Sequence, residues 1–317
     1  MIGVITGFAI IMVVIAVGYV LGRIKIIPPG EARLMLNRVA FYAATPALLF
    51  TVVSTSPPQA LFSPVIAVSL LATLLTGAVF LVVARVLPGR QQHSAADTAM
   101  GAAAASYVNS NNIGLPVSMY VLGSAAYIPP ILVIQMALLT PLLLSVLGAS
   151  GAGGGSHGST TRAVLGAIRT ALLSPIVLAS VAGLVVCLTS ITVPEPVMAP
   201  LEILGGASIP MILMSFGASL NTTTVLDSPK DRSRVLLATG LKTLVMPLLA
   251  WLLTLGLGLE GEERYAAIIL AALPTAQNVY NYAATFQKGT IVARDTVLLT
   301  TFTSLPVMLT IAVLSGR

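Results

Sequence analysis

Five polar or helix-breaking residues inside one long apolar segment are the best candidates for chemistry in this sequence. The segment 95–123 contains Asn109, Asn111, Asn112, Gly114 and Pro116. Side-chain amides can donate and accept hydrogen bonds, and Pro116 removes a backbone donor and disfavours a helical conformation at the preceding residue. In hydrocarbon the freed peptide groups need partners, so such an interruption persists only inside protein or beside a cavity. These residues predict a polar site at a broken helix or, alternatively, a proline kink whose asparagines bond to a neighbouring helix.

A second segment of the same kind occurs in the other half of the chain. The segment 264–287 carries Pro274, Gln277, Asn278 and Asn281. Interrupted helices at corresponding positions of two halves indicate the binding site of a transporter. Neither interruption contains an Asp or Glu residue, so a buried carboxylate that relays protons has no obvious candidate there.

Composition indicates the class of protein that holds these segments. The chain has 317 residues, of which 56% are hydrophobic and only 8% are charged, and its mean hydropathy is +0.98. A soluble domain carries roughly 25% charged residues, so the sequence predicts an integral membrane protein. The basic residues are spread through short loops, so we interpret the pI near 9.7 as a sign of membrane topology and not of nucleic-acid binding.

Apolar stretches of about 20 residues are long enough to cross a bilayer as helices. Ten such stretches predict an all-α integral membrane fold with helices at 2–22, 33–54, 62–86, 95–123, 126–148, 164–188, 197–219, 233–257, 264–287 and 291–314. Most Lys and Arg residues lie in the loops that follow odd-numbered helices. Because cytoplasmic loops are enriched in positive charge, we expect these loops in the cytoplasm and both termini outside a cell membrane. Residues 1–21 lack a basic leader, so we expect an uncleaved first helix.

The midpoint of the chain divides the predicted helices into two groups of five. Residues 149–163 form a Gly-rich linker, expected in the cytoplasm, between a first repeat at 1–148 and a second at 164–317. An offset near 165 residues pairs Gly18 with Gly183, Pro29 with Pro194, Pro46 with Pro210, Asn112 with Asn278, Gly123 with Gly289 and Pro141 with Pro306. Each half has an odd number of helices, so the second half enters the membrane from the opposite side. The pattern predicts an inverted repeat.

The inversion is expected to bring the two interruptions to the same depth. Asn109 lies twelve residues after Asp97, and Pro274 lies eleven residues after Glu263. These separations correspond to about 18 Å and about 16 Å of helix, near the middle of a hydrocarbon core about 30 Å thick. The fourth and ninth helices would cross there as broken helices. The half-helix after each break would point its N-terminal N–H groups at the crossing, where they would attract an anion.

Lys242 is a further candidate because it lies inside the eighth predicted helix, eight residues after Arg234. A cation within the membrane is costly and marks a functional candidate. Its ammonium could hold a substrate carboxylate, or it could offset the negative C-terminal end of a half-helix, and both roles stay open. Tyr107 could line a cavity for a planar substrate or pack in the core.

The sequence offers little chemistry for an enzyme. His93 and His157 have no partners at the spacing of metal ligands, and neither a GxSxG elbow nor a phosphate-binding GxxxxGK motif occurs. We therefore expect no catalytic residues, no metal and no cofactor. A Ser–Lys catalytic pair built on Lys242 stays open as an alternative.

Several motifs resemble the auxin efflux carrier family of bacterial and plant transporters. The resemblance extends over nearly the whole chain and is carried by GYVLG at 18–22, FYAATPALLF at 41–50, NNIGLP at 111–116, the stretch 207–220, and Leu273-Pro274 with Asn278. It implies ten helices in two inverted five-helix repeats, crossed fourth and ninth helices, a homodimer, and an elevator-like motion of a substrate-carrying domain. Carried over by position, the crossover residues are Asn112, Pro116, Pro274 and Asn278. Family members move organic anions such as indole-3-acetate, malonate and malate. The long cytoplasmic loop of the plant carriers is missing here, so auxin itself is not supported.

These inferences combine into one functional hypothesis. We expect a secondary carrier of small organic anions, with a malonate-, malate- or auxin-like carboxylate bound at the crossover. It would act in a lipid bilayer as a homodimer, without nucleic acid. The expected binding residues are Asn109, Asn111, Asn112, Pro116, Lys242, Pro274, Gln277, Asn278 and Asn281. A sodium- or proton-coupled symporter or antiporter of related inverted-repeat fold is an alternative, and an intramembrane enzyme or sensor is another.

Overall fold

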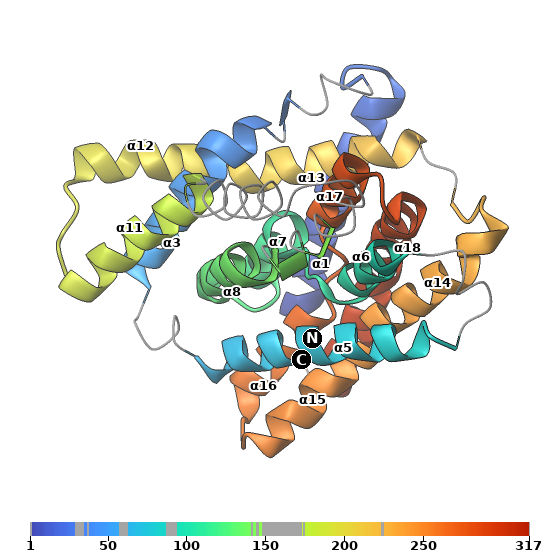
Figure 1. Cartoon of the computed structure of the whole chain (residues 1–317). Coiled ribbons are helices and arrows are strands. Elements are labelled where there is room, and N and C mark those ends of the chain that lie inside the picture. Colours follow the sequence, from blue (N-terminus) through green and yellow to red (C-terminus); the bar gives the residue numbers. More distant parts are fainter. Residues whose placement is uncertain are drawn as a thin grey trace, which may run out of the picture. The chain divides into compact units, whose positions relative to one another are not determined.

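The computed structural model is built almost entirely of helices (Figure 1). It describes residues 2–28, 35–36, 38–56, 63–86, 94–140, 142–143, 146–147, 173, 175–222 and 225–316. Within these residues there is no sheet, only one isolated β-bridge. The predicted Gly-rich linker at 149–163 lies outside the described residues.

The chain forms two compact units, and each unit takes segments from both halves of the sequence. Unit 1 comprises Met1–Ser63, Asn111–Val133 and Leu172–Thr223, and unit 2 comprises Pro64–Ser110, Ile134–Ala171 and Thr224–Arg317. The division of the chain into repeats at 1–148 and 164–317 is a separate matter from these compact units. The repeats remain a prediction about sequence symmetry.

Unit 1 is held together by helices that pack on α1 and α3. Its elements are α1 (Ile2–Arg23), η1 (Ala40–Ala44), α3 (Thr45–Thr55), α7 (Leu115–Tyr120), η4 (Ala125–Tyr127), α8 (Ile128–Ile134), α11 (Pro175–Thr189), α12 (Glu195–Gly206), α13 (Ser208–Ser219) and η6 (Leu220–Thr222). The helix α13 packs along α1, and α11 and α12 pack on α3. The buried hydroxyl groups of Thr45 and Ser208 share a hydrogen bond of 2.7 Å between α3 and α13.

Glycines allow α1 and α13 to approach closely. A Cβ atom added to Gly18 would overlap the backbone of Met214, and one added to Gly217 would overlap the carbonyl oxygen of Ile15. Each helix thus places a glycine against the backbone of the other. Small residues at such contacts let membrane helices pack tightly, because lipid supplies little hydrophobic drive for helix association.

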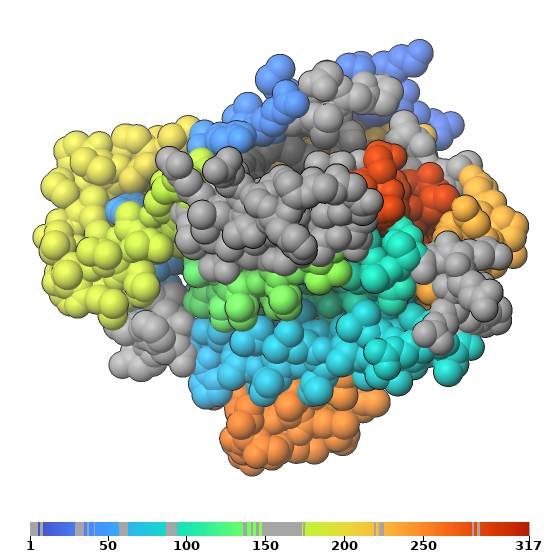
Figure 2. All heavy atoms as spheres, viewed as in Figure 1, coloured from blue at the N-terminus to red at the C-terminus, as the bar shows by residue number. Residues whose placement is uncertain are grey.

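Unit 2 surrounds a core of small and apolar side chains. Its elements are α5 (Pro64–Val83), α6 (Ala95–Ser106), η5 (Gln135–Leu139), α14 (Pro229–Gly240), η7 (Leu241–Val245), α15 (Met246–Gly256), α16 (Gly261–Ala271), α17 (Gln277–Phe286) and α18 (Thr290–Leu314). Phe80, Met100, Ala238 and Val279 bring α5, α6, α14 and α17 into one buried cluster. The helices α15 and α16 pack against α5 and are visible along its edge (Figure 2).

Four described helices are long and apolar enough to cross a membrane. They are Pro64–Val83, Glu195–Ala218, Pro229–Gly256 and Thr290–Leu314. Each matches one of the predicted spans, and shorter apolar helices occur at Ala9–Arg23, Tyr42–Thr55, Ala125–Ile134 and Pro175–Thr189. The predicted spans 95–123 and 264–287 are both interrupted, as described below. The arrangement of ten helices in two inverted repeats remains a prediction.

Three of the helices begin after a widened turn that precedes a proline. Pro46, Pro116 and Pro247 each lie two residues after a π-helical segment and within the first turn of the next α-helix. Proline lacks an N–H group and clashes with the preceding turn, and a π-turn is one way to relieve that conflict without ending the helix. The turn before Pro247 contains Lys242.

Candidate functional site

The two interrupted segments meet through their backbones. Residues Tyr107–Asn109 separate α6 from the π-turn η3 (Ser110–Gly114), and residues 272–276 separate α16 from α17. Val108 and Thr275 form an antiparallel bridge. The Asn109 N–H donates to Pro274 O at 2.8 Å, and the Ala276 N–H donates to Tyr107 O at 3.1 Å. Peptide groups released by one break are thus satisfied by the other, as burial requires.

Thr275 ties this bridge to two neighbouring helices. It is fully buried, its N–H donates to Thr300 Oγ1 at 3.0 Å, and its Oγ1 donates to Ala104 O at 2.6 Å. The bridge is therefore anchored to α18 and α6. Thr275 and Thr300 were not predicted from the sequence, although the hydroxyl directly after Pro274 was a signal for a partner of the broken backbone.

The side chain of Gln135 forms hydrogen bonds with residues of the first interruption, between α6 and η3. Its Nε2 donates to Val108 O at 2.9 Å, and its Oε1 accepts from Ser110 Oγ at 3.0 Å. The Tyr107 hydroxyl donates to Gln135 O at 2.7 Å and also shares a hydrogen bond with Thr140. Tyr107 thus fixes the break and packs in the buried core of unit 2. Sequence analysis missed Gln135, whose signal was a lone amide within the apolar stretch 126–148.

The predicted residues of the first segment form one directly bonded pair. Asn111 Nδ2 donates to Asn112 Oδ1 at 3.0 Å, and both side chains are half-buried. Within the described residues, the buried Asn111 Oδ1 has no hydrogen-bond partner. Asn109 is buried at the bridge, and Pro116 is buried in the first turn of α7.

The predicted residues of the second segment lie around the start of α17. Pro274 is buried at the bridge, and Gln277 and Asn278 are half-buried in the first turn of α17. The N-cap residue Ala276 offers no side chain that could accept from the first N–H groups. An uncapped helix start of this kind carries positive partial charge and can receive an anion. Asn281 lies in the same helix, and its side chain is outside the described set.

Lys242 contacts the end of the preceding half-helix. The residue is fully buried, and its Nζ donates to Ala271 O at 2.9 Å and to Met246 Sδ at 3.1 Å. Ala271 is the last residue of α16. Two roles for Lys242 were considered from the sequence. This contact corresponds to the one in which the ammonium offsets the negative C-terminal end of a half-helix. A direct role in substrate binding remains a prediction.

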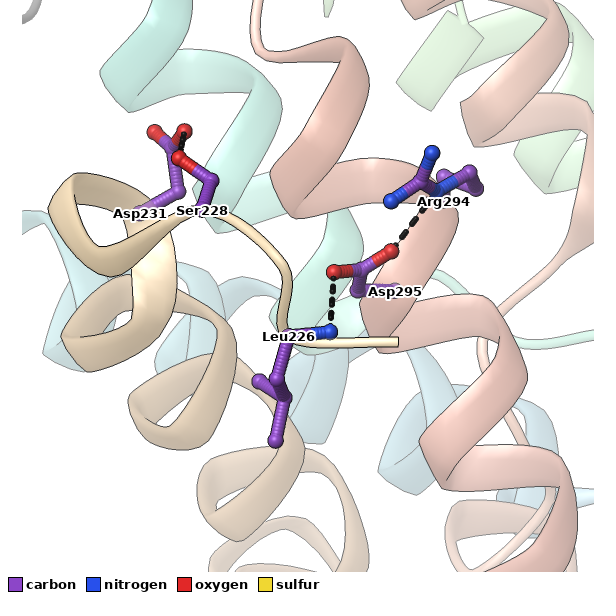
Figure 3. Close-up of polar contacts among 5 residues, drawn as sticks. All are labelled: Leu226, Ser228, Asp231, Arg294 and Asp295. Atoms are coloured by element: carbon purple, nitrogen blue, oxygen red, sulfur yellow. Dashed lines mark hydrogen bonds and ion pairs between the residues drawn. The ribbon is translucent and has the colours of Figure 1, made fainter. Parts of the chain in front are cut away.

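A separate polar group organises the start of α18. The carboxylate of Asp295 is buried, and its Oδ2 accepts from the N–H of Leu226 at 2.9 Å while its Oδ1 pairs with Arg294 Nε at 2.7 Å (Figure 3). Nearby, Ser228 Oγ donates to Asp231 Oδ2 at 2.6 Å in the first turn of α14 (Figure 3). Asp295 thereby links α18 to the loop that leads into α14.

Asp97 has a similar linking role at the start of α6. Its Oδ2 accepts from the N–H of Ser94, and Ser94 Oγ accepts from the Asp97 N–H, so the pair forms a capping box. Asp97 Oδ1 also accepts from the Gly289 N–H at 2.8 Å. Gly289 has a φ of +55°, a left-handed conformation that glycine adopts without strain. This carboxylate joins the start of one interrupted segment to the turn after the other.

The geometry supplies no metal centre among the residues described. No group of three or more His, Cys, Asp and Glu residues in that part of the chain could hold an ion. A groove of about 660 Å³ on unit 2 lies between α15, α16 and α18 and is lined mainly by apolar side chains, with Arg264 among its lining residues. Its lining residues do not include any of the predicted binding residues.

The chain is similar in sequence to proteins of membrane transport. A family model described as "Membrane transport protein" matches residues 3–312. A protein of Rhizobium meliloti named "Putative malonate transporter" is 27% identical over 296 residues, covering 92% of this chain and 89% of the relative. An "Uncharacterized transporter" of Methanothermobacter thermautotrophicus is 25% identical over 267 residues, covering 84% and 83%. Because the family model matches nearly every residue, the chain belongs to the membrane transport protein family, the auxin efflux carrier family that its motifs resemble.

Proposed function

We propose that this protein is a secondary carrier that moves a small organic carboxylate across a membrane. The observation that carries the proposal is the bridge between Val108 and Thr275, which brings two interrupted helices together. Discontinuous helices in transporters typically bind substrate at the break, where a half-helix N-terminus meets the anionic group. The uncapped start of α17, with Gln277 and Asn278 in its first turn, supplies such an N-terminus.

The carboxylate class follows from the chemistry of this start and from one relative. N–H groups and side-chain amides can bind carboxylate oxygens without a compensating cation. The name of the Rhizobium meliloti relative refers to malonate, a small dicarboxylate. The transporter family and the transporter names of both relatives also suggest transport rather than enzymatic turnover.

The mechanism in the proposal is alternating access of the elevator type. We assign the bridge and α17, which both belong to unit 2, to the substrate-carrying part, while the predicted residues Asn112 and Pro116 belong to unit 1. The proposal includes ten helices in inverted repeats, crossed at the fourth and ninth, with both termini outside the cell membrane. It also includes a homodimer as the working form.

Uptake by purified protein in proteoliposomes tests the proposal. We expect the protein to accumulate labelled malonate or malate, and we expect Asn112→Ala and Asn278→Ala to reduce uptake at least tenfold, or about 1.4 kcal/mol, while the proteins stay folded. The matched control is Asn221→Ala, because Asn221 is an exposed amide that bonds to Tyr19 O at 3.0 Å and belongs to neither interrupted segment of the sequence.

Three results would contradict this assignment in different ways. Normal uptake by both asparagine variants would remove these residues from the site. Uptake that strictly requires sodium or a proton gradient would favour the coupled symporter or antiporter. Chemical turnover of a substrate without any flux would favour an intramembrane enzyme.

A further inference from the structure

Lys242 places a buried amine beside no carboxylate among the described residues. The residue is fully buried, and the described contacts of its ammonium are one carbonyl, Ala271 O, and one thioether, Met246 Sδ. Among the described residues, no ion pair involves Lys242. A buried cation is strongly unfavourable unless a neighbouring group offsets its charge. The compensation must therefore come from a group other than an acidic side chain.

The end of α16 is that group. The Ala272 N–H bonds back to Ile268 O at 3.0 Å, and the chain then leaves the helix toward Pro274, which has no N–H. The last carbonyl groups of a helix lack partners and carry roughly half a negative charge. Lysine side chains near a helix C-terminus bind these carbonyls favourably. The ammonium of Lys242 occupies such a position at a helix that ends in the interior.

The first half of the chain has the same arrangement without the cation. At the offset of 165 residues, Lys242 and Ala271 correspond to Gly77 and Ser106, and Ser106 is the last residue of α6. The structure places Gly77 beside Ser106, since a Cβ atom added to Gly77 would lie 3.4 Å from Ser106 Oγ. The two positions thus face the ends of equivalent half-helices. Only the second half supplies a positive charge there.

We propose that Lys242 is a tethered cation, which fills at the end of α16 the place that a small monovalent cation would otherwise take. An ammonium group attached to the chain does not have to bind from solution. It therefore loses no translational entropy when it occupies the site. The existence of this site does not depend on the proposed carrier function. Its consequence, which rests on the proposed carrier function, is that transport does not require a coupling cation at this position.

Removal of the ammonium should create a site for a free cation. We expect Lys242→Ala to lower the thermal unfolding midpoint in choline chloride, and we expect sodium, ammonium or methylammonium chloride at equal concentration to restore several degrees of it. A ligand that binds only the native state raises apparent stability in this way. Wild-type protein should show no such preference among the salts. The control is Lys230→Ala, since Lys230 is an exposed cation in α14.

Two results would overturn the tethered cation. One is a folded Lys242→Ala protein whose midpoint is the same in every salt. The other comes from Lys242→Met, which keeps a long side chain but has no charge. This variant is the test if the alanine variant does not fold. A methionine variant as stable as wild type would show that the position needs apolar volume and not positive charge.

Uptake measurements test the consequence for transport separately. We expect wild-type uptake to be equal in sodium and choline chloride, and uptake by Lys242→Ala to require an added small cation. Strict sodium dependence of the wild-type protein would overturn the inference that Lys242 replaces a coupling ion. Absence of carboxylate uptake by wild-type protein would contradict the proposed function, while the thermal measurements would still decide whether a cation site exists.

Discussion

At the scale of single residues, the polar groups beside the two breaks have mostly structural partners. Gln135 and Thr275 bond to backbone atoms of the interrupted segments, and Lys242 bonds to the last carbonyl of α16. The half-buried side chains of Asn278 and Gln277 lie next to this framework in α17. A rigid framework of buried polar groups is what a binding site needs to hold its ligand-contacting residues in place.

Gln135→Leu should destabilise the protein because it removes this framework while keeping a similar side-chain volume. Val108 O would lose the Gln135 Nε2 donor but keep the N–H of Ser110, and Ser110 Oγ would lose the Gln135 Oε1 acceptor. A typical hydrogen bond contributes about 0.5–1.5 kcal/mol to stability. We expect a lower midpoint when the helical signal is followed by circular dichroism during heating. Ser110→Ala removes only one of the two bonds, so its effect should be smaller. Equal midpoints for Gln135→Leu and wild type would contradict this role.

At the scale of elements, prolines and glycines determine where helices stop and how closely they pack. Pro116 and Pro274 lie in the two interrupted segments, and Pro247 follows the π-turn that contains Lys242. Each proline removes a backbone donor and thereby changes the path of the helix before it. The glycines Gly18 and Gly217 instead remove a side chain where two backbones meet.

Gly217→Ala should loosen the contact between α1 and α13. The added methyl group would overlap the backbone of Ile15, which cannot move as a flexible side chain could. We expect a loss of about 1–3 kcal/mol, the range typical of overpacking, seen as a lower unfolding midpoint in detergent. Gly206→Ala is the matched control in the same unit, because no atom lies within 4 Å of its added Cβ. A midpoint for Gly217→Ala that is no lower than that of Gly206→Ala would contradict the close contact.

At the scale of the whole molecule, the inverted repeat makes a prediction about topology. Lys230, at the start of α14, is expected on the cytoplasmic side, and Glu260, before α16, is expected outside. Both residues are exposed, and the single cysteine, Cys187, is buried and can be replaced by serine.

Cysteine labelling measures this orientation directly. In a Cys187→Ser background, we expect Glu260→Cys to react with a membrane-impermeant maleimide in intact cells. Lys230→Cys should react only after the membrane is permeabilised. Labelling of both positions in intact cells, or the reverse pattern, would contradict the predicted orientation.

Much of the membrane character could be predicted from local sequence, but the contacts that build the candidate site could not. Four of the predicted spans correspond to helical stretches long and apolar enough to cross a membrane, and the segments with Pro116 and Pro274 are interrupted. A hydroxyl after Pro274 and a lone amide in an apolar stretch mark Thr275 and Gln135 as candidates, but neither signal says which atoms these side chains bond. Their partners lie 27 and 171 residues away in the chain.

The sequence by itself determined that the chain is a helical membrane protein and where its helices break, since hydropathy and missing backbone donors are local properties. The tertiary structure alone decided that Val108 pairs with Thr275, that Gln135 supports the first break, and that Lys242 reaches the end of α16. The physical reason is that a break only releases peptide groups. Which distant atoms satisfy them depends on how the helices pack, and no spacing along the chain encodes that choice.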